Sequence, residues 1–182
     1  MDALTLLLTR QSTPRLIAPA PTEEQLTNIL NAAIRVPDHA GLTPWEFIIA
    51  TGDGLHKLGD IFAEATTINS DEVEKIDKAR SMPLRAPMVI TVVAKVKQHA
   101  KVPAFEQQLA AGCAAMAMQQ AVFAQGLGGI WRTGPLAFDR YVHQQLALKE
   151  CDQIVGFLYI GTPAIPVNTK PIKEGMGFAR YL

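Results

Sequence analysis

The chain has 182 residues, of which 48% are hydrophobic and 19% charged, and its 17 basic side chains equal its 17 acidic ones. This length suits one domain with a substantial core, so we expect a single domain over residues 1–182. The composition argues against disorder, and the balanced charge argues against a nucleic-acid partner, because no basic field is available to follow a phosphate backbone.

Helix and strand patterns mix in the first half of the chain. Residues 2–9 are predicted to form a short helix. Thr22 and Gln25 form a capping box, and the helix that they begin is stopped by Pro37. Residues 45–51 (WEFIIAT) indicate a buried strand. Helical spacing then continues over two further segments, with apolar positions at Leu55, Leu58, Ile61, Phe62 and Ala65, followed by Val73 and Ile76.

The second half contains the strongest strand signals. The β-branched run over residues 87–96 predicts a central strand. Strands and helices do not alternate strictly, which favours an α+β domain with a central sheet over a doubly wound parallel sheet. The other expected elements are an alanine-rich helix over 102–125, a short strand over 128–133, a helix over 138–148, a strand over 154–161, and a tail over 162–182 that wraps over a surface.

The segment from Gln107 to Trp131 carries no charged residue and is long enough to span a bilayer. It contains five glutamines, however, and closes on glycines, so we expect no membrane association. A helix that is apolar on nearly every side instead predicts a fully buried central helix. Because a domain of this size would struggle to bury such a helix alone, we expect an obligate homodimer.

The cysteines and the N-terminus indicate the compartment. Cys113 lies in an apolar run and is expected to be a small buried thiol, and neither it nor Cys151 belongs to a metal-binding or CxxC pattern. Low cysteine use fits a reducing cytoplasm. The first apolar stretch follows no basic region and is interrupted by Thr5 and Thr9, so we expect no signal peptide and a cytoplasmic protein.

Two polar clusters lie in the first quarter of the chain. Residues 9–15 hold two guanidiniums with several hydroxyls, which could form a phosphate clamp or an ordinary solvated turn. In residues 35–45, Asp38 and His39 could act as an acid–base pair, or His39 could be a solvated side chain. No second His or Cys stands at a ligand spacing, so we expect no metal.

A third cluster is the glycine-rich segment 126–134. It follows a helix and precedes a strand, whereas a dinucleotide fingerprint needs the strand first and the helix second. We therefore expect these glycines to end the helix and to let the backbone approach something closely. No nucleophile elbow, Walker motif or Ser/His/Asp set is present, so we expect no catalytic side-chain acid or base.

Taken together, the three clusters resemble the nitroreductase family, and within it the YdjA-like NAD(P)H nitroreductases. Residues 10–15 resemble the family's Arg-Arg-Ser-x-Arg motif, with one Gln for Arg and one extra residue. Residues 37–45 resemble its Pro-Ser-x-x-Asn-x-Gln-Pro-Trp motif, with Gly41 and Thr43 in place of the Asn and the Gln. The resemblance covers nearly the whole chain and implies a nitroreductase-like fold, with a mostly antiparallel central sheet flanked by helices.

The resemblance also implies FMN at a dimer interface and NAD(P)H as the hydride donor. Arg10, Gln11 and Ser12 match positions that hold the FMN phosphate, and Arg35 and His39 match positions that reach FMN from the partner subunit. A Lys of the family is Pro14 here, which leaves open the cation that faces the flavin N1 and O2 edge. Trp131, Arg132 and Thr133 match a segment along the flavin, and a nicotinamide site is implied at Ala121, Val122, Phe123, Ala124, Gln125 and Gly126.

The function expected from this resemblance is an FMN-dependent NAD(P)H oxidoreductase that reduces a nitroaromatic, a quinone or a similar small acceptor. Neither the acceptor nor a preference for NADH over NADPH follows from the sequence. A flavin-binding sensor or carrier without nicotinamide turnover is the alternative, because the Asn and the Gln of the second motif are replaced.

Overall fold

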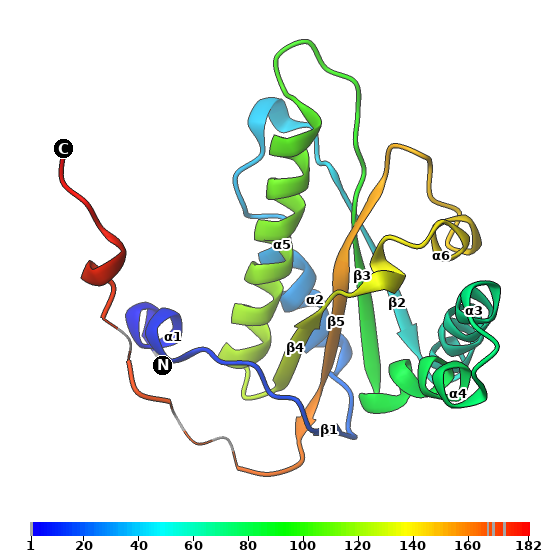
Figure 1. Cartoon of the computed structure of the whole chain (residues 1–182). Coiled ribbons are helices and arrows are strands. Elements are labelled where there is room, and N and C mark those ends of the chain that lie inside the picture. The colour runs from blue at the N-terminus through cyan, green and yellow to red at the C-terminus, as the bar shows by residue number, and fades with distance from the viewer. Residues whose placement is uncertain (1, 167, 169, 173) are drawn as a thin grey trace.

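A computed structural model of the chain, which describes all residues except 1, 167, 169 and 173, has one five-stranded sheet at its centre (Figure 1). The long strand β5 (Gln153–Pro163) pairs with β3 (Met88–Ala94), with β4 (Gly128–Arg132) and with the two-residue β1 (Leu16–Ile17). The strand β2 (Trp45–Thr51) pairs with β3. All of these pairs are antiparallel, which confirms the α+β class and the antiparallel sheet.

Helices cover both faces of the sheet (Figure 1). On one face, α2 (Glu23–Ala33) and α5 (Ala104–Ala124) enclose one apolar cluster against the strands. On the other face, α3 (Asp53–Asn69), α4 (Val73–Ser81) and α6 (Arg140–Gln145) enclose a second cluster. Every residue of β3 is buried, because this strand is central and is covered on both faces, as predicted.

Local signals placed most elements correctly. Thr22 caps α2, and its side chain and that of Gln25 form the predicted capping box. The helix predicted over 138–148 is shorter, because the Asp139 side chain accepts from the amides of Tyr141 and Val142 and begins α6 at Arg140. The strand β1 was not predicted, since two residues carry no periodicity.

Residues 45–51 form the predicted strand, but the prediction that this strand is buried is wrong. In β2 only Ala50 is buried. The strand lies at the edge of the sheet with β3 as its one neighbour among the described strands, so its apolar side chains are only partly covered. An apolar run by itself does not distinguish an edge strand from a central one.

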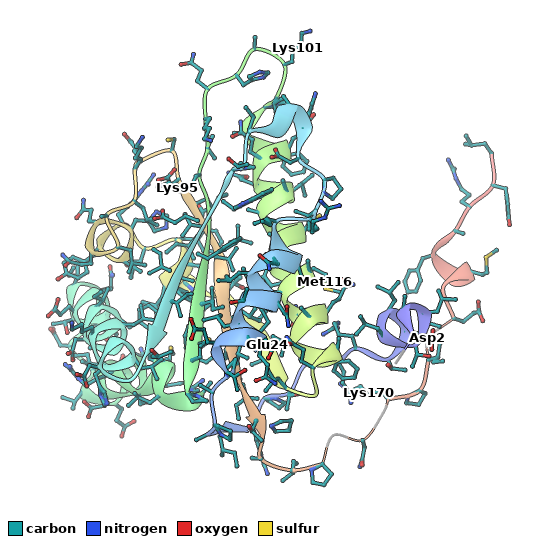
Figure 2. All side chains as sticks on the ribbon, turned by 180° about the vertical axis from the view of Figure 1, so that it is seen from behind. Asp2, Glu24, Lys95, Lys101, Met116 and Lys170 are labelled. Carbon is teal, nitrogen blue, oxygen red and sulfur yellow. The ribbon has the colours of Figure 1, made fainter. Side chains whose placement is uncertain are left out.

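The expectation of a fully buried central helix is also not met within one chain. One face of α5 packs on the sheet, but Phe105, Leu109 and Met116 on the other face are 67%, 52% and 36% exposed. Met116 points away from the sheet in Figure 2. Cys113 is exposed on α5 as well, which corrects its predicted burial. The helix α5 therefore presents an outer apolar face, which we define as Phe105, Leu109, Cys113 and Met116.

Both ends of the chain extend from the body of the domain. The helix α1 (Ala3–Thr9) has no buried residue, and its outward leucines are more than half exposed. Apart from residues 167, 169 and 173, the tail runs outward beside α1 (Figure 1). It follows the N-terminal segment of its own chain, where the Gln11 side chain donates to the Asn168 carbonyl. Phe178 near the end of the tail is 92% exposed.

Candidate functional site

The loop after α1 is fixed against the end of the sheet. The Thr13 amide donates to the Gly129 carbonyl at 2.9 Å, and Leu16 then pairs with Pro163 in β5. Gly128 allows this close approach, because a Cβ on it would lie 2.6 Å from the Leu16 side chain. The predicted role of the glycine cluster is thus confirmed here: the backbone after α5 approaches another segment closely.

Cations gather where this loop meets the tail. Arg10, Gln11, Ser12 and Lys170 line a cleft of about 420 Å³. Gln11, Ser12 and Lys170 also line a neighbouring cleft of about 340 Å³, together with Arg15. No carboxylate lines either cleft among the described residues. The two clefts share residues and so form one trough that is suited to an anion.

Gln11 is a buried polar residue among those that line this trough. Its Nε2 donates to the Asn168 carbonyl at 2.7 Å, whereas its Oε1 has no hydrogen-bond partner among the described residues. A buried, unpartnered amide oxygen is costly and is typical of a place where a ligand or water completes the bonding. Lys170 was missed by the sequence reasoning, since a single lysine in an irregular tail carries no pattern. Figure 2 shows Lys170 on the tail.

The trough continues into an apolar cleft of about 530 Å³ at the end of α5. Phe123, Gly126 and Leu127 line this cleft, and Thr13 belongs both to it and to the cation-lined part. Of the six residues predicted to border a nicotinamide, Phe123 and Gly126 line this cleft. Val122 is buried, Ala121 packs against the core beside α2, and the Gln125 amide donates to backbone carbonyls of Gln25 and Ala121.

A second cleft, of about 380 Å³, lies on the opposite face of β4. It is lined by Arg132, Thr133 and Gly134, and also by Arg85 and Tyr159, which the sequence reasoning did not single out. The Arg132 guanidinium carbon lies 5.8 Å from the centre of the Tyr159 ring. Its Nε atom is buried without a hydrogen-bond partner among the described residues.

Two guanidiniums give this second cleft a positive potential. Burial raises the pKa of Tyr159 and keeps its phenol neutral, although the charges of Arg85 and Arg132 act in the opposite direction. Among the described residues, the lining of this cleft contains no carboxylate. The cleft can therefore receive an electron-rich or anionic group, and its two arginines would stabilise negative charge that develops there.

Trp131 lies on the other face of β4 from Arg132, because neighbouring strand residues point in opposite directions. Its indole Nε1 donates to the Val155 carbonyl at 3.3 Å, and its ring packs with the cluster under α5. Gly156 leaves room for the indole, since a Cβ there would lie 2.1 Å from Nε1. In the predicted flavin segment, Trp131 is thus partly buried against the cluster under α5, whereas Arg132 and Thr133 line a cleft.

His39 and Arg35 lie apart from both sites. Arg35 is exposed just after α2. His39 Nδ1 is 2.7 Å from Glu106 Oε2, in the first turn of α5. One interpretation of the sequence paired Asp38 with His39. The Asp38 carboxylate makes its bonds elsewhere. It accepts from the amides of Leu42 and Thr43, at 3.0 and 2.7 Å.

The helix α5 separates His39 from the trough within one chain. Glu106, which contacts His39, begins this helix, whereas Phe123 and Gly126 at the trough end it. The 21 residues of α5 span about 30 Å at the usual rise per residue. A mononucleotide is shorter than this, so one bound molecule cannot touch both His39 and Ser12 of the same chain.

The described residues show neither a metal site nor a membrane-spanning helix. They contain no group of three or more His, Cys, Asp or Glu side chains placed to hold a metal ion. None of the helices formed by these residues has both the length and the apolar character that crossing a membrane requires.

Comparisons with known proteins agree on one family. The family model described as "Nitroreductase family" matches residues 7–162. The "Putative NAD(P)H nitroreductase YdjA" of Escherichia coli K12 is 48% identical over 169 residues, which cover 93% of this chain and 92% of that protein.

Solved structures agree on the fold. The structure of a nitroreductase-like family protein from Bacillus cereus has a TM-score of 0.85 at 21% identity, covering 100% of this chain and 96% of that one. A nitroreductase with bound FMN from Bacteroides fragilis has a TM-score of 0.72 at 18% identity, covering 96% and 97%.

Proposed function

The chain belongs to the nitroreductase family, and on this premise we propose that it is an FMN-dependent NAD(P)H oxidoreductase. The acceptor is a small planar molecule, such as a nitroaromatic or a quinone. A trough and a cleft that carry cations and, among the described residues, no carboxylate support this proposal. The buried Arg132 Nε, a donor without a hydrogen-bond partner among the described residues, supports it as well.

The described residues fit the parts of FMN. Arg10 and Ser12, with the amide of Gln11, would hold the phosphate, and Arg15 or Lys170 would add charge to the same trough. Arg132 and Thr133 would lie along the flavin. Bound FMN would supply two-electron transfer between the nicotinamide nucleotide and the acceptor.

The chain itself would contribute to this chemistry by positioning the flavin and by placing positive charge beside it. Arg132, with Arg85 beside it, would stabilise the negative charge of a reduced flavin, so Arg85 is our candidate for the cation that replaces the family Lys at Pro14. No side-chain acid or base is required.

The proposal includes a homodimer with FMN at the interface. Its first support is the length of α5, which keeps His39 away from Ser12 within one chain, so that Arg35 and His39 would have to come from a partner. The outer apolar face of α5 and the exposed leucines of α1 are the second support. Burying this surface against a second copy would remove it from water.

Purified protein tests the proposal directly. We expect a flavin absorption spectrum, FMN rather than FAD in the supernatant after denaturation, and oxidation of NADH or NADPH that depends on an added quinone or nitroaromatic. A colourless protein that does not take up FMN would refute the proposal. Bound FMN without nicotinamide oxidation would instead identify a flavin-binding sensor or carrier.

A further inference from the structure

The proposed function leaves one close contact of His39 without a role. Glu106 lies 67 residues further along the chain, and its Oε2 is 2.7 Å from His39 Nδ1. Both side chains are partly exposed, at 56% for His39 and 44% for Glu106. The net stabilisation that such an exposed pair contributes to the fold is about 0–1 kcal/mol. The contact therefore matters more for the direction of the imidazole than for stability.

The backbone that carries Glu106 is held firmly. The next residue, Gln107, is buried, and its side chain bonds three backbone groups: the amide of Lys97 at 2.8 Å, the carbonyl of Lys97 at 2.8 Å and the carbonyl of Val102 at 3.2 Å. These bonds tie the first turn of α5 to the loop that follows β3. The Glu106 carboxylate is thus presented from a fixed position.

The turn that carries His39 is also fixed. The two backbone bonds to Asp38 hold a turn in which Ala40 and Thr43 adopt positive φ angles of 63° and 47°. Residues with side chains seldom adopt such angles unless the surroundings impose them. The Lys97 ammonium adds a bond to the Leu42 carbonyl. Asp38 and Lys97 thus both hold the backbone of this turn.

A carboxylate accepts hydrogen bonds and donates none, so the His39 nitrogen that faces Glu106 must carry a proton. The hydrogen bond at one ring nitrogen determines which atom the other nitrogen offers to a ligand. With Nδ1–H directed to Glu106, Nε2 is the atom that His39 presents outward.

We propose that Glu106 is a positioning residue that holds the His39 ring as its Nδ1–H form, so that Nε2 faces the FMN bound by the partner subunit. This inference rests on the proposed function, since it assigns His39 to the cofactor. Glu106 itself does not touch the cofactor and acts through His39.

Two measurements on the full-length protein test this inference. A long-range ¹H–¹⁵N correlation spectrum at pH 8.5 reports which ring nitrogen of His39 is protonated. The His39 signal is assigned as the one that is missing from the spectrum of His39→Ala. We expect the Nδ1–H form in the wild type, its loss in Glu106→Ala, and partial retention in Glu106→Gln, whose amide oxygen still accepts. FMN titration should give a Kd about two- to fivefold higher for Glu106→Ala, because the contact is weak and partly exposed.

A double-mutant cycle separates positioning from a general structural effect. Glu106→Ala should not weaken FMN binding further once His39 is alanine. Glu24→Gln is the matched control, because Glu24 occupies the first turn of α2, as Glu106 does that of α5, and it should leave both the FMN Kd and the His39 signal unchanged.

Several results would overturn the inference. If Glu106→Ala binds FMN normally and leaves the His39 signal unchanged, this inference is wrong while the proposed function stands. The same holds if Glu106→Ala weakens FMN binding as much in the His39→Ala background as in the wild type. A wild-type chain that binds no FMN overturns the proposed function together with this inference.

Discussion

Gly156→Ala tests how closely β4 and β5 pack around Trp131. An added Cβ would lie 2.1 Å from the Trp131 Nε1 atom and 2.8 Å from the Arg132 carbonyl oxygen. Such approaches do not occur between real atoms. The indole could rotate, but the carbonyl belongs to the backbone of β4, so β4 would have to move away from β5. Since Arg132 and Thr133 line the cleft, this shift would reach the proposed flavin site.

Overpacking of this kind typically costs about 1–3 kcal/mol. For a chain of this length, each kcal/mol lowers Tm by about 2–4 °C, so we expect a fall of about 2–12 °C. Thermal unfolding followed by circular dichroism measures it. Tryptophan emission in a Trp45→Phe background, where Trp131 is the remaining tryptophan, should report a changed environment, and FMN binding should weaken.

Gly54→Ala is the matched control for this substitution. A Cβ on Gly54 would meet only the Ala50 Cβ at 3.7 Å, which is ordinary van der Waals contact, and the residue is helical. This variant should be neutral or more stable by about 0.5–1 kcal/mol. A Gly156→Ala protein with wild-type Tm and wild-type Trp131 emission would refute the packing argument.

Three further substitutions test the proposed cofactor site and dimer. Arg10→Ala should raise the FMN Kd about tenfold or more, since a charge-assisted bond contributes about 1.5–3 kcal/mol, and unchanged affinity in a fluorescence titration would contradict the clamp. Arg132→Ala should lower the two-electron potential of bound FMN by about 30–60 mV, at about 1.4 kcal/mol per 30 mV, and the potential of Arg132→Lys should lie between those of Arg132→Ala and the wild type. Equal potentials by spectroelectrochemistry would exclude a role for the Arg132 charge. Leu109→Lys should give a monomer without FMN by native mass spectrometry, whereas Leu84→Lys, an exposed control outside α5, should leave the dimer intact. A Leu109→Lys monomer that keeps FMN would contradict an interfacial site.

Features that depend on neighbours in sequence could be predicted from the sequence. The Thr22 capping box needs only the residues of one helical turn, and it is present as predicted. The β-branched run of β3 favours an extended backbone by itself, and the strand forms there. The family resemblance was equally available, because it depends on the order and spacing of motifs, and the comparisons confirm it.

Burial and pairing depended on tertiary structure. The apolar pattern of β2 is that of a buried strand, yet its place at the sheet edge leaves most of it only partly covered. The helix α5, which carries no charge after Glu106, likewise gave no indication of which face would meet the sheet and which would stay open with Cys113 on it. An apolar side chain is more stable when it is removed from water, but the chain topology decides whether another segment is there to cover it.

Some residues of the candidate site could be recognised from the sequence, and others only from the tertiary structure. Arg10 and Ser12 attract notice because they are close in sequence, whereas Arg85, Lys170 and Glu106 join their sites from distant segments that carry no motif. Trp131 and Arg132 are adjacent in sequence, and the alternation of a strand places them on opposite faces of the sheet. Local sequence determined which segments form helices and strands; the packing of those segments decided which side chains share a cleft, because contacts between distant residues exist only once the sheet and its helices have assembled.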